Sequence, residues 1–89
     1  MYSLRTTPDF SRDLKKLDSS VAKRILNKLD YLAKNPKLAE SLEYLPKDLE
    51  GLKKFRVGDW RVLFWLDENN KAIVLYGVDH RGSVYKRFS

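Results

Sequence analysis

Hydrophobic residues follow a helical period in the first third of the chain and alternate with polar residues in the last third. Met1–Thr6 alternates over a short length, which predicts a strand. Thr7 and Pro8 then suit a helix start, since a threonine side chain can cap a helix and proline lacks the N–H that the first turn leaves unpaired. Apolar residues follow at the spacing of one helix face: Phe10, Leu14 and Leu17.

A second helical pattern begins after the polar group Asp18-Ser19-Ser20, which ends the first helix and caps the next. Its apolar stripe consists of Val21, Ile25, Leu29 and Leu32. Asn35-Pro36 stops it, because a residue before proline avoids the helical conformation. The two segments predict an αα-hairpin. The cations off the stripe are interpreted as a solvated face: Lys23, Arg24, Lys28 and Lys34.

The second half of the chain changes its period. Lys37–Asp48 is ambiguous, and we expect a connector with one or two helical turns. Alternation from Leu52 onward predicts three strands: Leu52–Val57, Trp60–Leu66 and Ala72–Val78. The tail Asp79–Ser89 is mostly polar and has lost the alternation. The pattern predicts an α+β fold: an N-terminal strand, the αα-hairpin, then an antiparallel β-meander forming a curved sheet with the helices on one face.

The hairpin around Gly58-Asp59 has an unusual charge pattern. A two-residue turn there pairs Val57 with Trp60 and Arg56 with Arg61. One face then suits a core, with Phe55, Val57, Trp60, Val62 and Phe64. The other carries Lys54, Arg56, Arg61, Leu63 and Trp65. Like charges directly opposite each other are destabilising, and neither strand contains an acid near them. We therefore expect an anion between these cations. Arginine side chains that are splayed apart, or that are each held by a carboxylate of the chain, would argue against a nuclease and leave only a basic scaffold.

The composition fits a small basic domain. The chain has 89 residues, which we assign to one domain, residues 1–89, and its net charge is +6. Such a charge favours polyanionic partners: RNA, DNA or an acidic protein. The chain has no cysteine, no apolar run long enough to cross a bilayer and no signal-like start, so a cytoplasmic location is the expectation.

Two motifs resemble one family. K-F-R-V-G-D-W-R at residues 54–61, followed by D-H-R-G-S-V-Y at residues 79–85, is similar to the RelE/ParE superfamily of bacterial and archaeal toxins. The resemblance implies a compact α+β toxin encoded beside a neutralising antitoxin, with which it can form a hetero-oligomer. It also implies one of two activities. The RelE branch cleaves messenger RNA in the ribosomal A site without a metal, and the ParE branch inhibits DNA gyrase.

The resemblance carries over to individual residues. It implies a catalytic set of Lys54, Arg56, Arg61, His80, Arg81 and Tyr85. We expect further RNA contacts from Lys53, Lys86 and Arg87. No cofactor and no metal are expected, which fits one histidine, no cysteine and no acidic cluster with ligand spacing. Trp60 departs from the pattern, since tyrosine is common in the family at that position.

Metal-free RNA cleavage sets clear demands on these groups. A base must deprotonate the 2′-hydroxyl, cations must stabilise the charge at phosphorus, and the leaving 5′-oxygen must gain a proton, which gives a 2′,3′-cyclic phosphate. Arg61 and Arg81 are the choice for the phosphate. Lys54, His80 and Tyr85 all stay open as the base. The alternatives are a gyrase inhibitor and a catalytically inactive binding module of the same fold.

Overall fold

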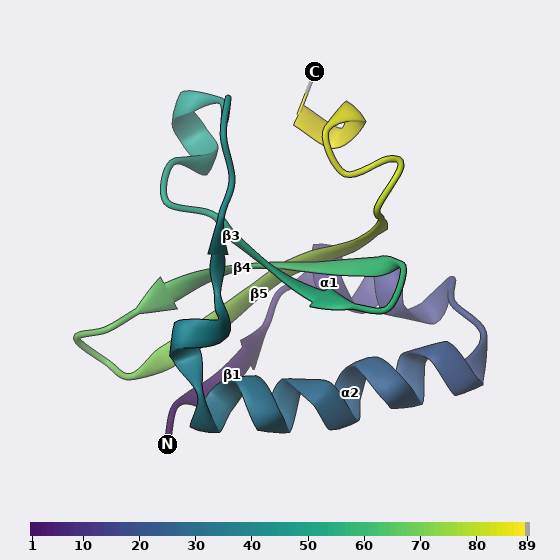
Figure 1. The fold of residues 1–89 in the computed structure, drawn as a ribbon, viewed down its shortest axis with the longest axis horizontal. Helices are drawn as coiled ribbons and strands as arrows, with labels where there is room; N and C mark the ends of the chain where they lie inside the picture. Colours follow the sequence, from purple (N-terminus) through teal and green to yellow (C-terminus); the bar gives the residue numbers. More distant parts are fainter. Residues whose placement is uncertain (89) are drawn as a thin grey trace.

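The computed structural model describes residues 1–88 of the protein. These residues form a five-stranded sheet in the order β1-β5-β4-β3-β2 (Figure 1). Its strands are β1 (Ser3–Thr6), β2 (Glu40–Ser41), β3 (Lys53–Val57), β4 (Trp60–Asp67) and β5 (Ala72–His80). The helices are α1 (Pro8–Lys15) and α2 (Ser19–Lys34), with short 3₁₀ turns η1 (Pro36–Leu38), η2 (Lys47–Leu49) and η3 (Lys86–Phe88). The predicted fold class is confirmed, and β1 adds to the antiparallel meander as a parallel edge strand beside β5.

The start of α1 follows the predicted capping. Thr7 Oγ1 accepts the Phe10 N–H at 3.3 Å and donates to the Leu75 carbonyl at 2.8 Å. The same hydroxyl thus caps α1 and fixes it where β1 leaves β5. Two details differ from expectation. α1 ends at Lys15, before Leu17, and Asp18 is the N-cap of α2 without a capping hydrogen bond from its side chain.

The main core lies between the helices and one face of the sheet. β3 and β4 pair in the predicted register, Val57 with Trp60 and Arg56 with Arg61. The predicted apolar face therefore packs on the helices, with Trp60 only partly buried. The buried residues of this core are Phe10, Ile25, Leu29, Leu32, Ala33, Phe55, Val57, Val62, Phe64, Ile73, Leu75 and Val78. Burying each large side chain contributes about 1.5–3 kcal/mol.

A smaller core lies on the opposite face of the sheet, which we call the outer face. Its buried residues are Leu42, Leu52, Leu63 and Val84, covered by Leu45, Trp65, Tyr76 and Phe88. Figure 1 shows which segments cover this face: the segment with η2 and the turn η3 both lie on the side of the sheet opposite α2. A bulge contributes, because Leu63 pairs with Gly77 and Phe64 with Leu75, so that Tyr76 has no partner in β4. The tail is therefore packed against the sheet despite its polar composition.

Two other boundaries differ from the sequence pattern. β5 continues to His80, so Asp79 and His80 are strand residues. The connector contains β2, which pairs Glu40 with Lys54 and Ser41 with Lys53. A strand of two residues is too short to show a period. Among residues 1–88, no helix combines the length and the apolar composition that crossing a membrane requires.

Candidate functional site

The outer face holds Arg56 and Arg61 side by side, as predicted. Their guanidinium groups diverge, however, so the expectation of an anion bound between these two arginines is wrong. Arg56 forms two parallel hydrogen bonds with the carboxylate of Glu40 in β2, Nε to Oε1 at 2.7 Å and Nη2 to Oε2 at 3.0 Å. This geometry is the bidentate fork that arginine also offers a phosphate. Arg56 is therefore neutralised by an acid that sequence reasoning missed, because β2 was not recognised.

Arg61 points the other way, toward the hairpin turn. Its Nη1 donates to the carbonyl oxygens of Gly58 and Trp60, each at 2.9 Å, and within residues 1–88 it has no carboxylate partner. Arg81 reaches the same turn. Its backbone N–H donates to the Asp59 carbonyl at 2.8 Å, and its Nε lies 3.6 Å from the Asp59 carboxylate. We call this region, residues 58 and 59 with the arginines around them, the hairpin tip.

Lys54 lies one row further from the tip on the same face. It stands between Glu40 of β2 and Leu63 of β4, and it is half-buried. Across the described part of the chain, Lys54 makes no hydrogen bond or ion pair, so its amine keeps all its donors. Lys53 points to the other side of the strand, where it lines a hollow together with Asp67. The structure thus brings Lys54 and Arg61 to one face and leaves Lys53 outside it.

His80 does not lie on the outer face. It pairs with Trp60, whose side chain belongs to the helix side, and the two rings meet edge to face at 5.4 Å. His80 Nδ1 accepts the Gly82 N–H at 3.2 Å. In the neutral ring the proton therefore sits on Nε2, which can donate a hydrogen bond but cannot take a proton. From the sequence, a meander that brings the end of its third strand close to the middle strand would place His80, Arg81 and Tyr85 near the face of Arg56 and Arg61. For His80 this expectation is wrong.

Tyr85 lies on the tail above the sheet. Its neighbour Val84 is buried in the outer-face core with Leu63, which holds this part of the tail over β4. Tyr85 is 47% exposed, and its ring meets the Phe88 ring edge to face at 6.3 Å. An exposed aromatic ring held in this way is suited to stacking on a nucleobase.

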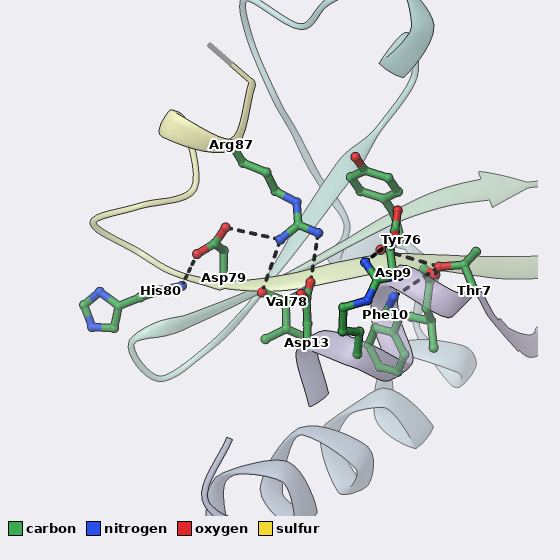
Figure 2. A network of polar contacts seen from close by, with 11 residues as sticks. Thr7, Asp9, Phe10, Asp13, Tyr76, Val78, Asp79, His80 and Arg87 are labelled. Carbon is green, nitrogen blue, oxygen red and sulfur yellow. Dashed lines mark hydrogen bonds and ion pairs between the residues drawn. The ribbon is translucent and has the colours of Figure 1, made fainter. Parts of the chain in front are cut away.

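Arg87 sits in a partly buried ion network that we call the tail clamp, made of Arg87, Asp13 and Asp79 (Figure 2). Its Nη2 lies 2.8 Å from Asp13 Oδ2, and its Nη1 lies 3.2 Å from Asp79 Oδ2. Asp13 also accepts the backbone N–H of Val78 at 3.0 Å, so the clamp ties η3 to both α1 and β5. An RNA contact by Arg87 would have to break this network, whereas Lys86 is exposed.

The charge of Arg87 is secured by its partners. Burial opposes the charged form, but hydrogen bonds and attraction from Asp13, with further hydrogen bonds from Asp79 and Tyr76, outweigh it. Together they raise the pKa of the guanidinium above its ordinary value. The cation also lies over the Tyr76 ring, 5.1 Å from its centre.

Comparison with known proteins gives consistent results. The family model described as ParE toxin of the type II toxin–antitoxin system parDE matches residues 4–85. A toxin of Methanocaldococcus jannaschii named RelE4 is 31% identical over 91 residues, covering 98% of this chain and 94% of that protein. Toxin RelG of Mycobacterium tuberculosis is 33% identical over 89 residues, covering 97% of this chain and 98% of that protein.

A solved structure is similar over most of the fold. The toxin–antitoxin complex RelBE2 from Mycobacterium tuberculosis contains a chain that superposes with a TM-score of 0.77 at 28% identity. The match covers 90% of this chain and 98% of that one.

Proposed function

Because the chain belongs to the RelE/ParE superfamily of toxins from type II toxin–antitoxin systems, we propose that it cleaves messenger RNA on the ribosome and so inhibits translation. One observation carries the proposal. Arg61 is fixed by the Gly58 and Trp60 carbonyls without a carboxylate partner in residues 1–88, so its charge is oriented but not neutralised. Such a cation is oriented to bind an anion, and a phosphate of an RNA backbone is a suitable anion.

Arg61 and Arg81 would bind the phosphate that reacts. Both guanidinium groups lie at the hairpin tip. The Arg81 guanidinium makes only a long contact with the Asp59 carboxylate, and the side chains of Arg81 and Asp59 are largely exposed. An exposed pair of that kind contributes little, so a phosphate can replace Asp59 at small cost. Two planar forks around one phosphate stabilise the charge that develops when the 2′-oxygen attacks.

Lys54 is the base we assign. It lies on the same face as Arg61 and lacks a partner among the described residues, whereas His80 lies on the opposite side with its acceptor nitrogen already used. A lysine acts as a base through the lone pair of its amine. Water protonates the leaving 5′-oxygen in this scheme, and Tyr85 stacks on a base of the message.

We also propose that a cognate antitoxin covers the outer face in a hetero-oligomer. The similar toxin from Mycobacterium tuberculosis was solved as a toxin–antitoxin complex. Here the outer face presents cations together with exposed Tyr85, so an acidic segment with apolar side chains would complement it. The reading frame beside the gene is the first place to look for that protein.

The decisive experiment compares arginine variants on ribosomes carrying a message. Arg61→Ala and Arg81→Ala should each lower the cleavage rate about 10²–10³-fold, because each removes a preorganised donor to the phosphate. Arg12→Ala is the matched control, since Arg12 is an exposed arginine paired only with Asp9 at 3.0 Å. It should cleave at the wild-type rate. Full activity of both tip variants would overturn the mechanism.

Inhibition of DNA gyrase is the second candidate, and the match to the ParE family model favours it. A gyrase inhibitor has no chemical step, so it does not need an oriented Arg61 or a partnerless Lys54. Supercoiling by purified gyrase in the presence of the protein distinguishes the two candidates. Loss of supercoiling with messages left intact would replace the ribonuclease proposal, and harmless expression without an antitoxin would indicate an inactive binding module.

A further inference from the structure

Arg24 differs from the other cations of α2 because its guanidinium rests against the hairpin turn. A Cβ atom placed on Gly58 would lie 3.3 Å from Arg24 Nη2 and 3.7 Å from its Cζ. Gly58 has a φ of +60°, a conformation that glycine adopts without strain. The glycine therefore makes the turn possible and also leaves room for the guanidinium beside it.

The position of Arg24 adds an uncompensated charge to the hairpin tip. Within residues 1–88, Arg24 makes neither a hydrogen bond nor an ion pair. Asp59, the acid of the turn, lies near Arg81, and Arg61 is held by carbonyl oxygens. Three guanidinium groups thus lie around a turn that contributes one carboxylate, that of Asp59. They belong to Arg24 in α2, Arg61 in β4 and Arg81 after β5.

Helix α2 extends this basic surface away from the tip. Lys28 and Tyr31 follow Arg24 at the i+4 and i+7 positions, which lie on the same face of a helix. All three side chains are exposed, and Tyr31 is 56% exposed despite its large ring. The nearest acid of the helix, Asp30, lies on the neighbouring stripe. Cations beside an exposed aromatic ring are a combination suited to binding single-stranded RNA.

We propose that RNA bound at the outer face crosses the hairpin tip and continues along α2, where Arg24 and Lys28 bind phosphates and Tyr31 stacks on a base. This inference rests on the proposed function, because RNA is its ligand. Arg24 contacts no reacting atom, so it is a binding residue and not a catalytic one. Its planar fork is suited to a phosphate.

The test measures cleavage of ribosome-bound message as a function of ribosome concentration and salt. Arg24→Ala should raise KM about tenfold with kcat unchanged, because it removes charge-assisted hydrogen bonds outside the chemical step. The slope of log KM against log salt should fall by about 0.7, the value for one phosphate contact of a single strand. Arg24→Lys keeps the charge without the fork and should give an intermediate KM.

Arg5→Ala is the matched control. Arg5 is an exposed arginine of β1 that pairs with Val74, near the end of the sheet opposite the tip. Its KM and salt slope should equal those of the wild type, and all three variants should unfold at the wild-type temperature because surface substitutions change stability little.

The outcomes separate this inference from the proposed function. Wild-type protein that leaves the message intact overturns both. Wild-type protein that cleaves, with Arg24→Ala behaving like Arg5→Ala, overturns the inference alone. Unchanged cleavage with weakened antitoxin binding by Arg24→Ala would also overturn it, since α2 would then be an antitoxin surface.

Discussion

The tail clamp and the hairpin tip are both built around arginines, but their environments differ. In the clamp, Arg87 has a side chain 19% exposed and two carboxylates within 3.2 Å. At the tip, Arg81 is 64% exposed and its carboxylate lies 3.6 Å away, while Arg61 and Arg24 have none within the described chain. The clamp has its anions inside the protein, whereas the tip keeps its cations available.

This difference separates structural cations from functional ones. A partly buried ion pair contributes to folding only when both partners stay, because removing one leaves the other desolvated and unpaired. An exposed cation with weak partners adds little to stability, so retaining it costs the fold little and leaves it available to a ligand. Substitution in the clamp should therefore change stability first, and substitution at the tip should change activity first.

Arg87→Met gives the largest expected change in stability. It should lower the free energy of unfolding by about 2–3 kcal/mol, since Asp13 and Asp79 lose their shared cation in a partly buried site. For a domain of this size the melting temperature should fall about 10–20 °C, which thermal unfolding followed by circular dichroism would measure. At a temperature where the variant is folded, cleavage should be close to wild type.

The pH range of this effect follows from the raised pKa of Arg87. A cation whose pKa is raised on folding contributes its stabilisation fully below the pKa of the unfolded chain and loses it only as the pH rises through the folded value. Arg87 therefore stays charged throughout the neutral range, and the destabilisation should be the same at pH 6 and pH 8. The control Arg12→Ala should lose less than about 1 kcal/mol, because its pair is exposed. Equal losses in both variants would contradict the comparison.

Gly77→Ala should have a smaller effect that depends on the clamp. A Cβ at Gly77 would overlap Arg87 Nη2 and lie 2.8 Å from both Arg87 Cζ and Asp13 Oδ2. Gly77 lies in β5 without the left-handed φ that requires glycine, so the added methyl acts through this crowding. The expected loss is about 1–2 kcal/mol. The double variant with Arg87→Met should lose about 1 kcal/mol less unfolding free energy than the sum of the two single losses. Strict additivity of the two losses would show that the two residues are not coupled.

The sequence predicts the hairpin well because local rules determine it. A two-residue turn at Gly58-Asp59 permits one register, and that register alone places Arg56 opposite Arg61 and divides the two faces. The helices follow from apolar periodicity in the same way. The fold class and the grouping of Lys54 with Arg61 could therefore be predicted before any coordinates.

Contacts between distant segments could not be predicted. The Arg56–Glu40 pair depends on a two-residue strand, and the Arg24–Gly58 contact joins residues 34 positions apart in the chain. His80 was placed on the wrong side because β5 runs two residues past the predicted end. Each of these features depends on how the elements pack, and no single stretch of sequence contains that information.

The environment of Arg56 is intermediate between those of the tail clamp and the hairpin tip. The variant Glu40→Gln tests whether Arg56 is a structural or a functional cation. The Arg56–Glu40 pair has the bidentate geometry of the clamp but the exposure of the tip, with side chains 62% and 37% exposed. If it is structural, the variant should lose stability. If Glu40 instead occupies the place of a phosphate, stability should change by less than about 1 kcal/mol, and the freed Arg56 should strengthen RNA binding. We expect the second result.

The measurement uses a short RNA with 2′-O-methyl riboses, which the protein can bind but cannot cleave because no 2′-hydroxyl is free to attack. Affinity should rise about fivefold in Glu40→Gln, and the slope of log affinity against log salt should steepen by about 0.7 for one added phosphate contact. Glu43→Gln is the matched control, since Glu43 is an exposed acid of the connector and the substitution changes the net charge equally. A gain of the same size in Glu43→Gln would assign the effect to net charge, and Arg56 would then belong with Arg87 as part of the scaffold.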